Sequence, residues 1–106
     1  MDLKSPPVRL LSDLVSYQEG AVVSREVVTK PAGTITIFAF DTGQGLSEHK
    51  TPYDGFAYIV DGEAEIKISG ADYHLGTGET IIMPANEPHA LKAIKRFKMM
   101  LVMVRS

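Results

Sequence analysis

Short runs of alternating apolar and polar residues make up most of the chain after residue 20. In residues 63–69 every second side chain is apolar, so the apolar side chains would share one face of a strand and the charged ones the other. Residues 21–29 and 34–40 are rich in β-branched and aromatic residues, which is also typical of strands. The pattern predicts an all-β fold in which the strands bury one face.

Turn-forming residues separate these runs at intervals of about eight to twelve residues, a spacing typical of sandwiches and barrels. Asp61 and Gly62 stand between the strand predicted over residues 55–60 and the alternating run over residues 63–69, so they predict a hairpin turn. Glycine-rich turns also bound a very short strand predicted at residues 73–75, and a further strand at residues 80–83 ends at a proline. Short strands in this arrangement favour an antiparallel barrel or sandwich over alternating strands and helices.

The two ends of the chain are less regular. Residues 8–17 suit a helical turn and a short irregular strand equally well, and the prolines before them favour an extended backbone. The apolar residues after position 89 could also line one face of a helix, but valines at 102 and 104 favour two strands joined near residue 95. We expect residues 1–20 to form an extended or irregular lead-in and residues 21–106 to form a single barrel domain.

The composition is that of an ordinary globular domain. The chain has 106 residues, 44% hydrophobic and 23% charged, so it can bury one core but is too short to divide further. It has no cysteine, which excludes disulfides and thiolate sites and fits a reducing compartment, so we expect a cytoplasmic location. A net charge of −2 gives no field to attract nucleic acid or an anionic membrane, and no apolar run approaches the roughly 18 residues of a membrane span. Small molecules are the expected partners.

Two histidines are the best candidates for chemistry. His49 lies in a polar, turn-forming segment before a strand, and His89 follows the loop over residues 85–88. Imidazole titrates near neutral pH and often binds metals, so the pair could hold a metal, act as acid and base, or simply be hydrogen-bonded in the interior. The third histidine, His74, lies between Tyr73 and Leu75, which would point inward on a short strand, so His74 is predicted on the surface.

The spacing around the first histidine resembles a motif of the cupin superfamily of small jelly-roll barrels. That motif runs Gly, five residues, His, one residue, His, three or four residues, Glu, six residues, Gly. Gly43, His49 and Gly62 match it, while Thr51 and Gly55 stand where the family has His and Glu.

The spacing around the second histidine resembles the second cupin motif, which runs Gly, five residues, Pro, one residue, Gly, two residues, His, three residues, Asn. Gly78, Pro84 and His89 match it, while Asn86 and Ala93 replace the Gly and the Asn. The resemblance covers residues 34–104 and implies a cupin-like double-stranded β-helix, or jelly-roll barrel, in a single domain.

In cupins that bind metal, the histidines and the glutamate of the first motif face inward with the histidine of the second. The resemblance therefore implies that His49 and His89 are the remaining ligands of one weakly held divalent transition metal, such as Zn, Ni, Fe or Mn. Thr51 would be a poor ligand and Gly55 offers none, so a firm site needs another protein ligand. The carboxylates nearest in sequence are Glu48, Asp54 and Glu87.

Strand alternation would put Thr51 and Tyr53 on the same face as His49. The predicted contacts of a small molecule in a central cavity are therefore His49, Thr51, Tyr53 and His89. Three functions remain open: a metal-dependent oxygenase, isomerase or lyase, a non-catalytic module that binds or senses a small molecule, and a metal-free acid/base isomerase or epimerase. The resemblance also implies a homodimer, because the apolar segments 21–28 and 101–104 would gain from cover at a sheet edge.

Overall fold

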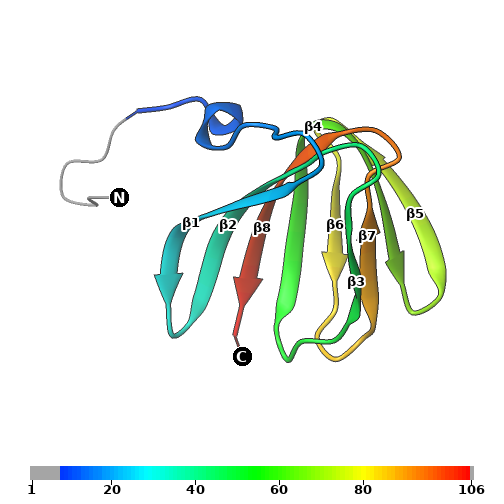
Figure 1. Ribbon diagram of the computed structural model, residues 1–106. Coiled ribbons are helices and arrows are strands. Elements are labelled where there is room, and N and C mark those ends of the chain that lie inside the picture. The colour runs from blue at the N-terminus through cyan, green and yellow to red at the C-terminus, as the bar shows by residue number, and fades with distance from the viewer. Residues whose placement is uncertain (1–7, 106) are drawn as a thin grey trace.

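The computed structural model describes residues 8–105, which form one curled antiparallel sheet with a short N-terminal segment packed on it (Figure 1). The one helix among these residues is the short 3-10 helix η1 (Leu11–Leu14). The predicted all-β fold is confirmed. The strands are β1 (Val22–Lys30), β2 (Gly33–Phe40), β3 (Gly45–His49), β4 (Asp54–Ile68), β5 (Ala71–Gly76), β6 (Thr80–Met83), β7 (His89–Lys92) and β8 (Phe97–Val104).

The strands follow the order β1-β2-β8-β4-β7-β3 across the sheet, and β5 and β6 each pair with β4. Because the sheet curls, β1, β2, β8, β6 and the first half of β4 form one wall of a barrel, which we call the first wall (Figure 1). The second wall consists of β3, β7, β5 and the second half of β4. This arrangement confirms the predicted single-domain jelly-roll barrel.

Strand β4 runs without interruption through Asp61 and Gly62, so the hairpin predicted there is wrong. The register with β8 shifts between Ile59 and Asp61, and Gly62 has a φ of 85°. A bulge with a left-handed glycine bends a strand, and here it carries β4 from the first wall to the second. A Cβ atom on Gly62 would collide with the carbonyl oxygen of Arg96, so this position requires glycine.

Several shorter elements differ from the prediction, and others decide between alternatives that the sequence left open. The turn-forming segment around residue 45 is the strand β3, and a non-strand stretch at residues 50–53 breaks the alternation expected from His49 into β4. Strand β5 is longer than predicted, and η1 is the helical turn left open for residues 8–17. The C-terminal part forms β7 and β8, so the helical alternative for it is wrong. The prolines before residue 8 lie outside the described residues.

Apolar side chains gather in two clusters, one inside the barrel and one outside it. Inside, the fully buried rings of Phe40 and Phe97 stack with centroids 4.4 Å apart. Burying a ring of this size contributes about 1.5–3 kcal/mol. Outside, Val15 packs with Ile37 and Ala39 on the outer face of the first wall, so the N-terminal segment covers part of that face.

The position of β8 bears on the expected homodimer. This strand lies between β2 and β4, so residues 101–104 have no free edge and the prediction that they pair at an edge is wrong. Strand β1 does lie at an edge.

Within residues 8–105, the structure contains no helix long and apolar enough to cross a membrane.

Candidate functional site

Strands β3 and β7 bring His49 and His89 together. The two residues are cross-strand partners, and their ring centroids lie 4.3 Å apart with 67° between the ring planes. His89 is 6% exposed, whereas His49 is exposed at the end of β3. A register shift between Leu46 and His49 marks an irregularity just before His49. The predicted convergence of the two imidazoles is therefore present in the structure.

The hydrogen bonds of the two rings fix which nitrogen carries the proton. Nδ1 of His49 lies 2.7 Å from the carbonyl oxygen of Ser47, and Nδ1 of His89 lies 3.3 Å from that of Glu87. A carbonyl oxygen can only accept a hydrogen bond, so each neutral ring donates its Nδ1–H. Each Nε2 then keeps a lone pair and can accept a hydrogen bond or bind a cation.

The pKa of His89 is held below its usual range. Burial disfavours the charged ring most, and the neighbouring His49 lowers the pKa further, while the contact with the Glu87 carbonyl acts in the opposite direction. His89 is therefore neutral at physiological pH, the state in which its Nε2 can accept.

Thr51 and Tyr53 lie in the loop between β3 and β4, where both are partly buried. The Thr51 hydroxyl donates to the Tyr53 carbonyl oxygen at 3.3 Å and accepts from the Tyr53 backbone N–H at 3.4 Å. The Tyr53 ring lies under the Arg105 guanidinium, with the carbon of that group 5.3 Å from the ring centroid. Both side chains have partners within the chain, so their contact with a ligand stays a prediction.

The candidate carboxylates do not join the histidines. Oδ1 of Asp54 accepts from the Ala85 backbone N–H at 2.9 Å, and Oε2 of Glu87 accepts from the Ser69 hydroxyl at 2.6 Å. Glu48 is exposed on β3. Among residues 8–105, no group of three or more histidine, aspartate or glutamate side chains is placed to hold a metal ion.

The sequence itself matches a known family. The Cupin domain family matches residues 36–105, which is more than half of the chain. This protein belongs to the cupin family. No curated protein matches the chain.

Solved structures show the same likeness. A conserved protein of unknown function from Streptococcus pyogenes is 37% identical, with a TM-score of 0.92 over 96% of this chain and 90% of that one. A cupin superfamily protein from Desulfitobacterium hafniense is 27% identical, with a TM-score of 0.89 over 95% and 94%. A Cupin 2 conserved barrel domain protein from Leptotrichia buccalis is 40% identical, with a TM-score of 0.88; the match covers 90% of this chain and only 46% of that protein.

This cupin does not fit a resident metal with four protein ligands. Gly55 stands at the position of the family glutamate, and the terminal methyl of Met83 lies 3.3 Å from the point where its Cβ would be. A methyl group of Leu101 lies 3.4 Å from the same point. Apolar side chains therefore fill the start of the path that a metal-binding carboxylate would take. The sequence showed the missing carboxylate but gave no signal for its replacement, because Met83 reaches Gly55 from a neighbouring strand.

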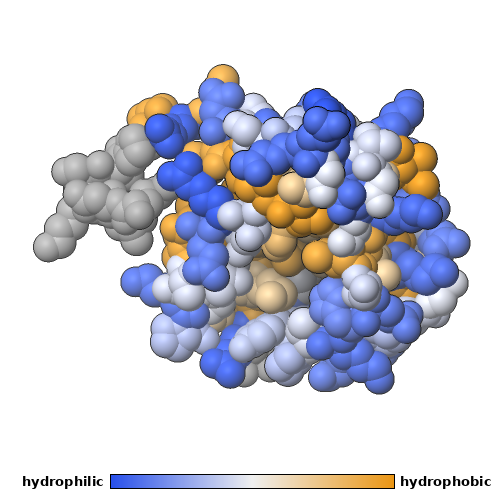
Figure 2. Space-filling view, viewed as in Figure 1, coloured by the Kyte–Doolittle hydropathy of each residue, from blue (hydrophilic) through white to orange (hydrophobic). Residues whose placement is uncertain are grey.

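A hollow lies elsewhere on this cupin, away from the histidine pair. It measures about 510 Å³ and is lined by Gly45, Ser47, Lys67, Ala90 and Lys92 among others, but by neither histidine of the pair. Lys67 alternates along β4 with the buried Ile66, so this hollow is on the outer face of the second wall. Figure 2 shows hollowed apolar surface in the middle of its view, between polar side chains.

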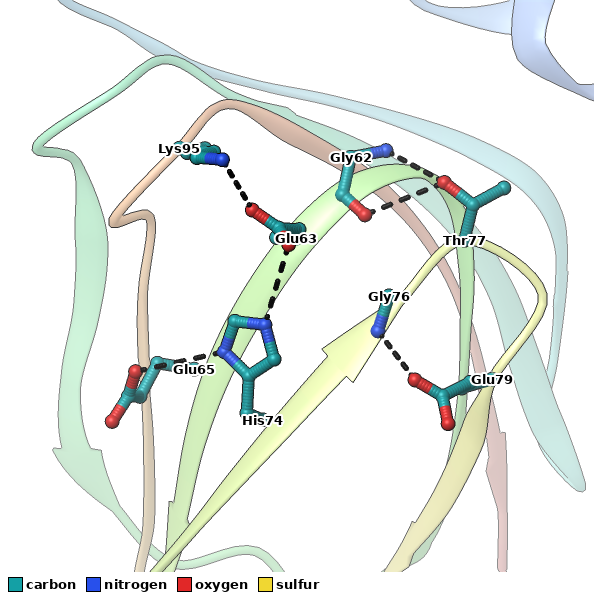
Figure 3. Close-up of polar contacts among 8 residues, drawn as sticks. All are labelled: Gly62, Glu63, Glu65, His74, Gly76, Thr77, Glu79 and Lys95. Atoms are coloured by element: carbon teal, nitrogen blue, oxygen red, sulfur yellow. Dashed lines mark hydrogen bonds and ion pairs between the residues drawn. The ribbon is translucent and has the colours of Figure 1, made fainter.

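His74 faces solvent on β5, as predicted (Figure 3). Its Nε2 lies 3.6 Å from a Glu63 carboxylate oxygen and its Nδ1 lies 4.0 Å from one of Glu65. Lys95 pairs with Glu63 at 3.0 Å, and this pairing is the main reason why the pKa of Glu63 is lowered. The group is a mixed-charge surface separate from the histidine pair.

Proposed function

We propose that this cupin binds a small organic molecule through His49 and His89 without turning it over. The observation that carries the proposal is the convergence of two imidazoles whose Nδ1 atoms face backbone carbonyls. Each ring then offers one hydrogen-bond acceptor, its Nε2, and the two ring centroids lie 4.3 Å apart. Such a pair favours a ligand that presents donors, such as an amine or a polyol.

The apolar side chains near Gly55 support a ligand with an apolar part. Met83 and Leu101 surround the position where metal-binding cupins have glutamate, and Met83 is only 2% exposed. A thioether side chain adapts readily to the shape of a neighbouring group. A compound with a donor-bearing head and a short hydrocarbon body matches this combination, with Thr51 and Tyr53 as further proposed contacts at the loop.

A divalent transition metal would be held by only two protein ligands. His49 and His89 can offer one Nε2 each, and firm protein sites for such metals use at least three ligands. We therefore propose that any bound Zn, Ni, Fe or Mn exchanges readily with buffer. A metal-dependent oxygenase, isomerase or lyase is correspondingly less well supported by these residues.

The acid/base alternative lacks a partner for its histidine. An epimerase of this kind needs a carboxylate that orients or assists the imidazole. Within the described residues, the rings of His49 and His89 contact backbone carbonyls, and neither has a carboxylate oxygen within 4.0 Å. Binding without turnover is the function that this geometry supports best.

A thermal-shift screen of the full chain tests the proposal. Small amines, polyols and organic acids are added one at a time, because a ligand that binds only the folded state raises the melting temperature. We expect a donor-bearing compound to raise the melting temperature of the wild type and not that of His49→Ala, a change at an exposed position. His74→Ala is the matched control and should respond like the wild type. A hit that still stabilises His49→Ala would contradict the proposed site.

A further inference from the structure

The barrel interior is packed closely at one end and less closely at the other. On β8, Phe97 is fully buried, whereas Leu101 and Met103 on the same inner face are only partly buried. On β2, Phe40 is fully buried and Thr34, on the same face, is only partly buried. The inner surface of the first wall is therefore accessible to a small molecule at this second end.

The accessible end is the one that carries the histidine pair. His89 is the cross-strand partner of Ile68, the last residue of β4. Asp54, the first residue of β4, is the cross-strand partner of Val104 on β8. Strand β4 bends at Gly62 and returns, so both of its ends lie at the end of the barrel that points downward in Figure 1. The histidine pair and the last residues of β8 therefore lie on opposite walls at the same end.

Arg105 extends β8 to this end of the barrel. Its backbone N–H donates to the Ala32 carbonyl oxygen at 2.9 Å, which continues the pairing of Gly33 with Val104 by one residue. Strand alternation then puts Arg105 on the same face as Met103, which is the inner face of the first wall. A cation therefore stands at the rim of the barrel, on the wall opposite the histidine pair.

The Arg105 guanidinium is held in place but keeps donors to spare. Its central carbon lies 5.3 Å from the centroid of the Tyr53 ring, and its Nη1 donates to the Pro31 carbonyl oxygen at 3.4 Å. It forms no ion pair with a carboxylate of residues 8–105. A planar guanidinium can stack on a ring and still bind a carboxylate through two parallel hydrogen bonds.

We infer that Arg105 binds a carboxylate of the ligand proposed above, a step that rests on that proposed function. The amine or hydroxyl end of the ligand contacts His49 and His89, and its carboxylate reaches the guanidinium on the opposite wall. Leu101 and Met103 line the inner face beside Arg105 and contact the hydrocarbon body. Packed sheets lie about 10 Å apart, which matches a body of a few carbons between the two polar ends. The ligand class is a small amino or hydroxy acid with its polar groups at opposite ends.

The two ends of the site select opposite groups. Each neutral imidazole offers an acceptor at Nε2, whereas the Arg105 guanidinium offers only donors. A dicarboxylate would place its second carboxylate against acceptors, and a diamine would place its second ammonium against a cation. Unfavourable pairings of this kind exclude a wrong ligand as effectively as good contacts favour the right one. An amino or hydroxy acid satisfies both ends in one orientation.

Isothermal titration calorimetry of the full chain with matched compounds tests the role of Arg105. The probes are ω-amino acids of about four to eight carbons, which suit the spacing of the walls, and the corresponding ω-amino amides. Each amide replaces the carboxylate by a neutral group of similar shape. We expect at least one amino acid to bind the wild type about tenfold or more tightly than its amide, because only the carboxylate makes charge-assisted hydrogen bonds.

Substitution of Arg105 should remove this difference. Arg105→Gln should lower the affinity for the amino acid to that for the amide and leave the affinity for the amide unchanged. Arg105→Lys should keep part of the difference, since it retains the charge but not the planar pair of donors. Lys92→Gln is the matched control, because Lys92 is exposed and alternates with the buried Leu91 on β7. It should keep the wild-type difference.

His49→Ala separates the role of Arg105 from the proposed function. It should weaken the binding of amino acid and amide alike, because both compounds use the histidine pair. Amides that bind through His49, with amino acids that bind no more tightly, would overturn the role of Arg105 and leave the proposed function standing. A difference that persists in Arg105→Gln, or a wild type that binds no compound of the series, would also overturn it.

Discussion

The terminal methyl group of Met83 lies 3.3 Å from the point where a Cβ atom on Gly55 would stand. Gly55 is buried on the inner face of β4, and Met83 is its cross-strand partner on β6. The cupin motif that the sequence resembles has glutamate at this position. Here two apolar side chains, those of Met83 and Leu101, lie next to the point where its Cβ would stand.

Gly55→Glu should therefore destabilise the protein without restoring a metal site. A carboxylate placed among apolar side chains with no partner costs about 3–5 kcal/mol of unfolding free energy. Urea denaturation measures the loss, and Gly55→Ala is the control, with an expected cost of about 1 kcal/mol because flexible side-chain ends can shift. A Gly55→Glu protein that regains wild-type stability on addition of Zn²⁺ would show that Met83 leaves room for a metal-binding glutamate at position 55.

Gly62→Ala should strongly lower the free energy of unfolding, although it adds only one methyl group. Gly62 has a φ of 85°, and an added Cβ would collide with the Arg96 carbonyl oxygen. We expect a loss of about 3 kcal/mol or more, from backbone strain together with displacement of β8.

The matched control for this change is Gly70→Ala. Gly70 has a φ of 84° but an added Cβ would meet nothing within 4 Å. Its replacement should cost about 1 kcal/mol from the left-handed backbone alone. Equal losses for the two variants would show that the crossing of β4 between the walls does not depend on the close approach at Arg96.

Strand β4 shows which features of the fold the sequence predicts and which it does not. Its alternating residues correctly predict burial of Ala64 and Ile66, since alternation is a local property. The Asp61–Gly62 pair has the composition of a hairpin turn, but pairing with β8 and β7 keeps one strand continuous through a bulge. The same limit applies at the site. Motif spacing predicts that His49 and His89 meet, whereas the side chain over Gly55 depends on a partner strand that local pattern does not reveal.

Tyr17 should make the unfolding free energy depend on alkaline pH. Its hydroxyl donates to Asp61 at 2.6 Å, and burial, followed by the bond to Asp61, raises the pKa of Tyr17. A raised folded pKa means that the contribution is fully present below the unfolded value of about 10 and is lost as pH rises toward the folded value. Tyr17→Phe should cost about 1 kcal/mol at pH 7.

The difference between wild type and Tyr17→Phe should then shrink above pH 10. Urea denaturation of both proteins at pH 7, 9 and 11 measures it, and other titrating groups cancel because they are common to both. Tyr58→Phe is the control, because Tyr58 is a partly buried tyrosine on β4. A difference that stays constant or grows with pH would contradict the role given to the bond with Asp61.

Removal of one imidazole should abolish metal retention while leaving the fold intact. Full-length protein loaded with Ni²⁺ and then dialysed against metal-free buffer should keep well below one equivalent, because two protein ligands hold the ion weakly. His49→Ala should keep none, and His74→Ala should match the wild type. Elemental analysis measures all three proteins. Retention of a full equivalent by the wild type would show that another protein ligand completes the site.

Histidine-selective long-range ¹⁵N NMR of the full chain at neutral pH, with and without the strongest thermal-shift hit, tests the central claim most directly. We predict that His49 and His89 both carry their proton on Nδ1, and that both Nε2 signals move when the compound is added while those of His74 stay in place. Protonation on Nε2 in either ring, or a bound compound that leaves both Nε2 signals unchanged, would contradict the account.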